Sequence, residues 1–151
     1  VRLRINPLVL ELMGRREPRT GLEGKFSVFH ATAVALVTGH AGAQAFTHAA
    51  VADPAVVALR RKVETEPDPA IGKDQADLTV TMNDGRILHE FVAHAVGSRA
   101  HPMSDAQLAD KFTGQADAIL PAGQVRRLLE LCQTAWTLDD AGRIASAGAL
   151  A

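Results

Sequence analysis

Residues 25–39 read KFSVFHATAVALVTG, and this stretch decides the fold that the sequence predicts. Its apolar side chains recur on almost every side of a helix from Lys25 to Val37, and Gly39 suits the left-handed C-cap position. A helix that is apolar nearly all round is buried on several sides. Ser27 and His30 lie three residues apart, so they share one face and give the helix its main polar feature.

Period-two patterns before and after this helix predict strands. Apolar and charged residues alternate over residues 1–5 and again over 62–66. The clearest hairpin pairs residues 77–82 with 86–92 around the turn 83–85, where a glycine is available for positive φ. The mixture of strands and helices predicts an α+β domain, with a small antiparallel sheet packed on the buried helix.

The segments between these elements read mostly as loops. Asn6-Pro7 breaks the first strand pattern, and residues 14–24 are rich in turn-forming and charged side chains. Residues 39–45 also read as a loop. Asp53-Pro54 has the form of an N-cap followed by proline, which predicts a short helix that runs through Arg60 and Arg61.

Helical patterns dominate the C-terminal third. Ser104 is the expected N-cap of a helix to about Phe112, and a second apolar stripe predicts a helix from Gly123 to about Trp136. The Ala/Gly-rich tail 139–151 reads as a frayed helix or a linker. We therefore expect an α+β domain over residues 1–103, whose start is missing, and C-terminal helices over 104–151.

Composition narrows the classes of partner. The chain has 151 residues, with 16 Lys+Arg against 17 Asp+Glu and 4% aromatic residues. Nucleic acids and anionic membranes require clustered positive charge, and base stacking requires aromatic side chains, so neither partner is expected. No apolar run approaches the roughly 20 residues of a membrane helix.

Cysteine and histidine patterns give no sign of a metal or cluster. Cys132 is the single cysteine, which excludes an internal disulfide, a cysteine-based zinc site and an iron–sulfur cluster, and favours a reducing, cytoplasmic setting. Five further histidines lack ligand-like spacing, so they predict no metal site; they are His40, His48, His89, His94 and His101. The basic pairs Arg60-Arg61 and Arg126-Arg127 are expected on solvated helix faces.

One group of residues could carry chemistry. Lys25 stands at the start of the predicted helix, where free N–H groups and the helix dipole favour an anion. His30 follows one turn later on a buried helix, where its pKa can be tuned for proton transfer. Two interpretations stay open: a carboxylate site beside an acid or base, or a solvated lysine and a core histidine bonded to a backbone carbonyl.

Several segments together resemble the C-terminal part of the MmgE/PrpD family, the relatives of 2-methylcitrate dehydratase. The resemblance covers the chain to about Phe112, and the helices beyond it fit more loosely. The segments that carry it, in the family's order, are Thr20 to Ser27 with Ala33 to Leu36 and Gly39, Asp53 to Leu59 with Lys62-Val63, Thr79 to Thr81 with Asp84 to Arg86, Gly97-Ser98, Pro102 to Asp105, Leu108 and Lys111-Phe112.

The resemblance implies a two-domain enzyme in which a large helical domain and an α+β lid, here residues 1–103, enclose small di- or tricarboxylates. The helices over 104–151 would then pack on that helical domain, which is absent. Family members remove a proton next to a carboxylate, as lyases or isomerases, without a metal or cofactor. Their main acid–base residues belong to segments upstream of Val1 and cannot be carried over. Lys25 and Ser27 match a family motif and are expected to bind substrate. His30 stands where relatives place a pocket tyrosine, which implies a catalytic role and leaves a dehydratase-specific role in doubt.

Two functions from different classes are therefore expected. In the first, the chain is the C-terminal part of such an enzyme and is inactive alone. In the second, it is a free-standing binding or assembly module that reuses the lid fold without catalysis. A buried helix that lacks part of its cover needs a partner in either case, so we also expect a homodimer.

Overall fold

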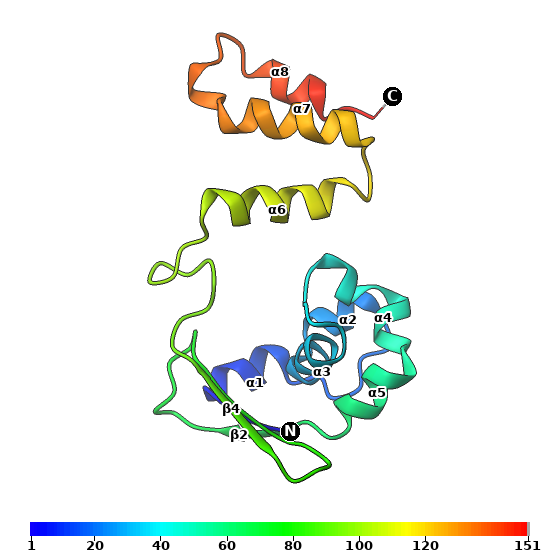
Figure 1. Ribbon diagram of the computed structural model, residues 1–151, viewed down its shortest axis with the longest axis vertical. Coiled ribbons are helices and arrows are strands. Elements are labelled where there is room, and N and C mark those ends of the chain that lie inside the picture. Colours follow the sequence, from blue (N-terminus) through cyan, green and yellow to red (C-terminus); the bar gives the residue numbers. More distant parts are fainter. Residues whose placement is uncertain (151) are drawn as a thin grey trace. The chain divides into compact units, whose positions relative to one another are not determined.

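The computed structural model describes residues 1–150, which form an α+β protein with two compact units, residues 1–102 and 103–150. Figure 1 shows the order of the elements along the chain. The first unit contains β1 (Arg2–Ile5), α1 (Pro7–Met13), α2 (Gly21–Lys25), α3 (Val28–Thr38), the 3-10 helix η1 (Ala43–Phe46), α4 (His48–Ala52), α5 (Pro54–Arg60), β2 (Glu64–Pro67), β3 (Ala76–Thr81) and β4 (Ile87–Val92). The second contains α6 (Asp105–Ala116), α7 (Ala122–Gln133), the 3-10 helix η2 (Ala135–Thr137) and α8 (Gly142–Ala147).

The sheet is mixed, with strand order β2-β1-β3-β4. The predicted hairpin is confirmed: β3 and β4 pair antiparallel, and Gly85 has φ 86° in the turn between them. β1 pairs antiparallel with β3 and parallel with β2, so the prediction of a purely antiparallel sheet was wrong. The chain leaves β1 and returns to β2 through α1 to α5, and parallel neighbours require such a long crossover.

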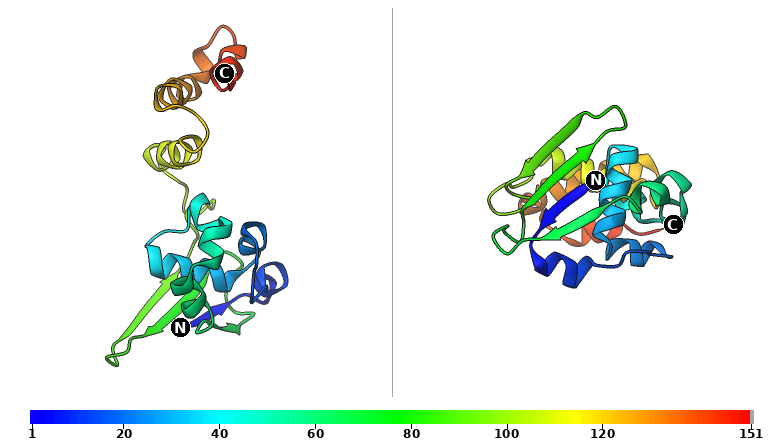
Figure 2. Two further views of the ribbon diagram at one scale, coloured as in Figure 1. Left: turned by 90° about the vertical axis from the view of Figure 1, so that its right-hand side faces the viewer. Right: turned by 90° about the horizontal axis from the view of Figure 1, so that it is seen from below.

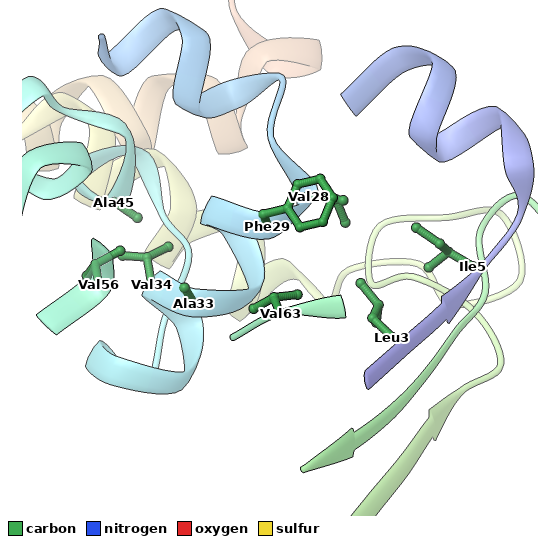
Figure 3. Close-up of a cluster of buried hydrophobic side chains, with 9 residues drawn as sticks. All are labelled: Leu3, Ile5, Val28, Phe29, Ala33, Val34, Ala45, Val56 and Val63. Carbon is green, nitrogen blue, oxygen red and sulfur yellow. The ribbon is translucent and has the colours of Figure 1, made fainter. Parts of the chain in front are cut away.

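Helix α3 lies at the centre of the first unit, as its apolar sequence predicts. Ala33 and Val34 are buried in its middle, and Phe29 is buried nearer its start. These side chains meet Leu3 and Ile5 of β1 in one hydrophobic cluster, which Figure 3 shows from both elements. The complete cluster of buried residues is Leu3, Ile5, Val28, Phe29, Ala33, Val34, Ala45, Val56 and Val63.

Several helix boundaries differ from the prediction because polar side chains cap the helices. The helix expected from Lys25 begins at Val28, since Ser27 is extended and its hydroxyl accepts the N–H of His30. Asn6-Pro7 does not merely end β1; the Asn6 side chain caps α1, and Pro7 occupies its first position. The tail beyond residue 139 contains α8, so it is helical.

Three short helical segments were also missed. The expected loop at residues 14–24 contains the start of α2, where Thr20 accepts the N–H of Glu23. The expected loop at residues 39–45 runs into η1, and α4 follows it with Thr47 as its N-cap. Each of these segments is only four or five residues long, too short to show a periodic apolar pattern.

On the outer face of the sheet, Arg4 connects β1 to its neighbours. It donates to Asp68 at 2.6 Å and to Asp77 of β3 at 2.9 Å. The backbone N–H of Ala70 and the Arg4 guanidinium together hold the pKa of the Asp68 carboxyl below its ordinary value. Around Arg4 this face is polar and charged, whereas the opposite face carries the apolar cluster.

The second unit is a small helical assembly with little interior. Ser104 and Gln107 form a capping box at the start of α6. At the start of α7, the Gln124 side chain donates to the carbonyls of Ala147 and Ala149, which connects α7 to the end of α8. Val125 is the one residue of this unit that is buried within the described part of the chain.

The cluster between β1 and α3 makes a testable prediction. Leu3→Ala removes a side chain that is 5% exposed, so it is expected to lower the free energy of unfolding by about 2–5 kcal/mol. Leu22→Ala is the matched control: Leu22 is 67% exposed, and its truncation should change stability by less than about 0.5 kcal/mol. Urea unfolding followed by circular dichroism measures both, and equal losses would contradict the assignment of the core.

Candidate functional site

The candidate site is the joint between α2 and α3. The backbone N–H of Phe26 donates to Glu23, and that of Ser27 donates to Gly24, which ends α2 in a tight turn. Ser27 then caps α3: its hydroxyl accepts the His30 N–H at 3.0 Å. Ser27 has no exposed surface. The sequence around residues 24–30 therefore fixes two helix ends and the segment between them.

The ring of His30 lies inside this joint with no exposed surface. Its Nε2 is 2.8 Å from the backbone oxygen of Ala45 in η1. A carbonyl oxygen only accepts, so Nε2 carries the proton and Nδ1 of the neutral ring is an acceptor. Nδ1 is buried and has no hydrogen-bond partner among the described residues. Phe46 packs edge-on against the ring, with 5.7 Å between ring centres.

Gly24 leaves the space that the histidine ring occupies. A Cβ at this position would lie 2.8 Å from Val51 Cγ2 and 3.2 Å from His30 Cδ2. Both distances are shorter than ordinary van der Waals contact. The glycine is therefore required by the close approach of α2 to His30 and α4.

Lys25 occupies a different position from the one that the sequence suggested. It is the last residue of α2, two residues before the cap of α3, so it does not stand in the first turn of α3. Its side chain is exposed, as is that of Phe26. Phe26 borders a surface depression of about 480 Å³, and the other residues that line it are Leu10, Glu11, Leu12, Gly14 and Arg15.

Charged groups surround the start of α2. Glu23 accepts the backbone N–H of Arg19 at 2.6 Å and the guanidinium of Arg15 at 2.9 Å. The Arg19 N–H and the Arg15 charge lower the pKa of the Glu23 carboxyl, so it is anionic at neutral pH. Arg16 lies over the ring of Phe29, with its central carbon 4.6 Å from the ring centre. Residues 15–25 carry four cations, at positions 15, 16, 19 and 25, against two carboxylates, at positions 17 and 23.

The structure thus separates the three predicted site residues by exposure. Lys25 reaches solvent, whereas Ser27 and His30 are fully buried. The Ser27 hydroxyl caps α3 by accepting the His30 N–H, and His30 Nε2 is bonded to the backbone oxygen of Ala45. As the joint stands, only Lys25 can meet a dissolved anion, and His30 can exchange a proton with a ligand only if the contact with η1 opens.

Arg60 is a buried cation that the sequence interpretation placed on a solvated face. It is 7% exposed, and it donates to the Val51 carbonyl at the end of α4. Burial lowers the pKa of its guanidinium, and its Nε has no partner among residues 1–150. The sequence could not distinguish Arg60 from its basic neighbours in this Arg-Arg-Lys run, because Arg60 is buried only by the packing of α4 on α5. Arg126 and Arg127 are exposed, as predicted.

The remaining histidines lie on the surface. His89 bonds to Asp77, and His94 bonds to Asp74, which fits the prediction of surface or locally bonded histidines. Within residues 1–150, no three His, Cys, Asp or Glu side chains are grouped as a metal site would require. No helix in the same range has the length and apolar character needed to cross a membrane.

Comparison with known protein families identifies the class of protein to which this fold and joint belong. The model of the MmgE/PrpD C-terminal domain matches residues 1–135, which include the whole first unit and part of the second. The chain is therefore a member of the MmgE/PrpD family, and the match extends beyond Phe112 through α7. A search of curated proteins finds no significant match.

The buried N-cap Ser27 should contribute more to stability than a solvent-exposed N-cap does. Ser27→Ala leaves the His30 N–H without a partner inside the protein, so the free energy of unfolding should fall by about 1–3 kcal/mol. Ser104→Ala is the matched control, because Ser104 caps α6 in contact with solvent and water can replace its hydroxyl. It should cost about 1 kcal/mol or less. Denaturant unfolding midpoints compare the two variants. A larger loss of stability for Ser104→Ala than for Ser27→Ala would contradict the prediction.

Proposed function

We propose that this chain acts within a cofactor-independent lyase or isomerase that uses small di- or tricarboxylates, as 2-methylcitrate dehydratase does. The observation that carries the proposal is that the family match spans the α2–α3 joint, where an exposed Lys25 closely precedes a fully buried histidine. Abstraction of a proton next to a carboxylate requires a cation to hold the anion and a group to exchange the proton. The joint offers one of each.

In this proposal the chain supplies part of the site and a helical domain supplies the rest. The exposed apolar side chains beside Lys25 support a covered rather than a solvated role: Leu12 is 63% exposed, Leu22 67% and Phe26 54%. The second unit also exposes Trp136 at 82% and Leu108 at 50%, and both line a groove of about 430 Å³ along α6 and α7. Docking of these helices on that domain would cover them. A cytoplasmic location belongs to the same proposal.

His30 has a specific place in the proposed chemistry. The hydrogen bond to Ala45 fixes the neutral ring with its proton on Nε2, so Nδ1 is the atom able to accept a proton. If η1 moved away from α3, the His30 ring would become accessible to a substrate held by Lys25.

Lys25→Met tests the carboxylate contact. In the enzyme assembled with its helical domain, loss of the ammonium should raise KM for a tricarboxylate such as citrate or methylcitrate about tenfold, which corresponds to about 1.4 kcal/mol. Lys62→Met is the control, because Lys62 is also exposed but lies in the turn before β2. Steady-state kinetics with both variants decide the point, and equal KM values would remove Lys25 from the site.

His30→Gln tests proton transfer separately from packing. A glutamine amide can keep a donor near the Ala45 carbonyl, yet it cannot exchange a proton at neutral pH. We expect kcat to fall by about 10²- to 10⁴-fold. Thermal unfolding serves as the control for folding. A folded variant with kcat within about threefold of the original would assign His30 to positioning only.

A non-catalytic binding or assembly module is the second candidate, and the complete burial of His30 favours it. In such a module, His30 is a core residue that holds η1 against α3. The unmodified protein would then show no turnover that Lys25→Met or His30→Gln could reduce. Titration with tricarboxylates would show no binding that depends on Lys25. Turnover of citrate or methylcitrate by the 151-residue chain alone would contradict both this candidate and the need for a helical domain.

A further inference from the structure

Strand β4 is an unpaired edge of the sheet. It follows β3 in the strand order, with no neighbour on its other side among the described residues. Figure 2 shows the β3–β4 hairpin projecting beyond the helices of the first unit. Every residue of β4 is exposed, and its four apolar side chains keep much of their surface: Ile87 66%, Leu88 53%, Phe91 46% and Val92 40%.

The hydrogen bonds of the hairpin fix which backbone groups face this free edge. Met82 donates to the Arg86 carbonyl at 2.8 Å, so these two residues form a hydrogen-bonded pair. Hydrogen-bonded and non-hydrogen-bonded pairs alternate along an antiparallel ladder. The peptide groups of Leu88 and Glu90 therefore face β3, and those of Ile87, His89 and Phe91 face outward.

The devices that usually protect an edge strand are few here. Proteins blunt such edges with proline, lysine, bulges or very short strands. Strand β4 has six residues without proline or lysine, and its register to β3 runs without a bulge from Ala76 opposite Val92 to Thr81 opposite Ile87. Glu90 is the one charged residue within the strand, and Arg86 precedes it.

We propose that β4 pairs antiparallel with β4 of a second copy of this chain, about a two-fold axis at Leu88. The outward peptide groups of Ile87 would then bond to those of His89 of the partner subunit, and the reverse. Leu88 would face Leu88 of the partner subunit in a non-hydrogen-bonded pair, where side chains approach most closely. The two four-stranded sheets would become one sheet of eight strands.

Charge complementarity selects this register. It places Arg86 opposite Glu90 of the partner subunit twice, and cross-strand pairs of opposite charge stabilise a sheet. The Nε of Arg86 donates to Asp84 at 2.7 Å, which leaves its terminal nitrogens for the carboxylate, and Glu90 forms no ion pair within residues 1–150.

The neighbouring registers are less favourable. An axis at Glu90 would set the two Glu90 carboxylates against each other, and like charges directly opposite are destabilising. An axis at His89 would oppose Leu88 to Glu90 and Arg86 to Val92, so it pairs no opposite charges. The inference concerns the edge strand alone and does not rest on the proposed function.

Disulfide trapping tests the register in the full 151-residue chain with Cys132→Ala, which removes the native thiol. Leu88→Cys is expected to give a disulfide-linked dimer on mild oxidation, because directly opposed Cα atoms about 4.5 Å apart suit a disulfide. Glu90→Cys is the matched control. Its two sulfurs would be four residues apart along the strands, about 13 Å, so it should stay monomeric. Trapping at Glu90→Cys or His89→Cys, but not at Leu88→Cys, would overturn the proposal.

Charge reversal tests the interface without a covalent bond. Sedimentation equilibrium should show a dimer of the unmodified chain, and Arg86→Glu should weaken it about tenfold or more. Combining Arg86→Glu with Glu90→Arg restores two opposite pairs and should restore the dimer, while far-ultraviolet circular dichroism confirms folding. A chain that is monomeric at about 100 μM would overturn the proposal. So would a dimer that Arg86→Glu does not weaken, because that result places the interface elsewhere.

Discussion

The burial of α3 is the constraint on which the first unit depends. This helix contributes Val28, Phe29, Ala33 and Val34 to the cluster that also holds Leu3 and Ile5 of the sheet. Because its apolar residues point in several directions, one covering layer is insufficient: the sheet takes one side, and α5, α2 and η1 approach the others. The crossover from β1 to β2 supplies these helices, so the parallel pairing of the two strands follows from the need to cover α3.

The same burial determines the chemistry available at the α2–α3 joint. His30 faces inward because the turn of α3 that carries it is covered by η1, and the Ala45 carbonyl satisfies one ring nitrogen while the other has no partner. An unpaired buried acceptor costs free energy unless a binding event or a movement supplies its partner. The joint thus combines a stable cap at Ser27 with a histidine whose second nitrogen is unsatisfied, and this combination connects the fold to the proposed function.

The two units differ in how completely they bury their apolar residues. The first has a continuous cluster, whereas the second has Val125 as its buried residue within the described chain and exposes Trp136 and Leu108 along one groove. A helical unit with so small an interior gains little from burial on its own. Its capping box and the Gln124 side chain define the helix ends, but those hydrogen bonds are mostly exposed and contribute modestly.

The sequence by itself determined the elements with long, regular patterns. The strands, the β3–β4 turn, the buried α3 and the helices α6 and α7 of the second unit could all be predicted, because apolar periodicity and cap residues are local properties. The family resemblance was also carried by local motifs, and the match over residues 1–135 confirms it. The local sequence pattern also predicted the exposure of Arg126 and Arg127.

Only the tertiary structure decided which way the chain turns between those elements and which polar groups it buries. The parallel pairing of β1 with β2, the break at Ser27 and the short helices α2 and α4 depend on how distant segments cover α3. The burial of Arg60 within an Arg-Arg-Lys run, and of His30 beside an exposed Lys25, arises for the same reason. A side chain is desolvated when another element packs over it, and the neighbouring residues in the sequence do not reveal which element that is.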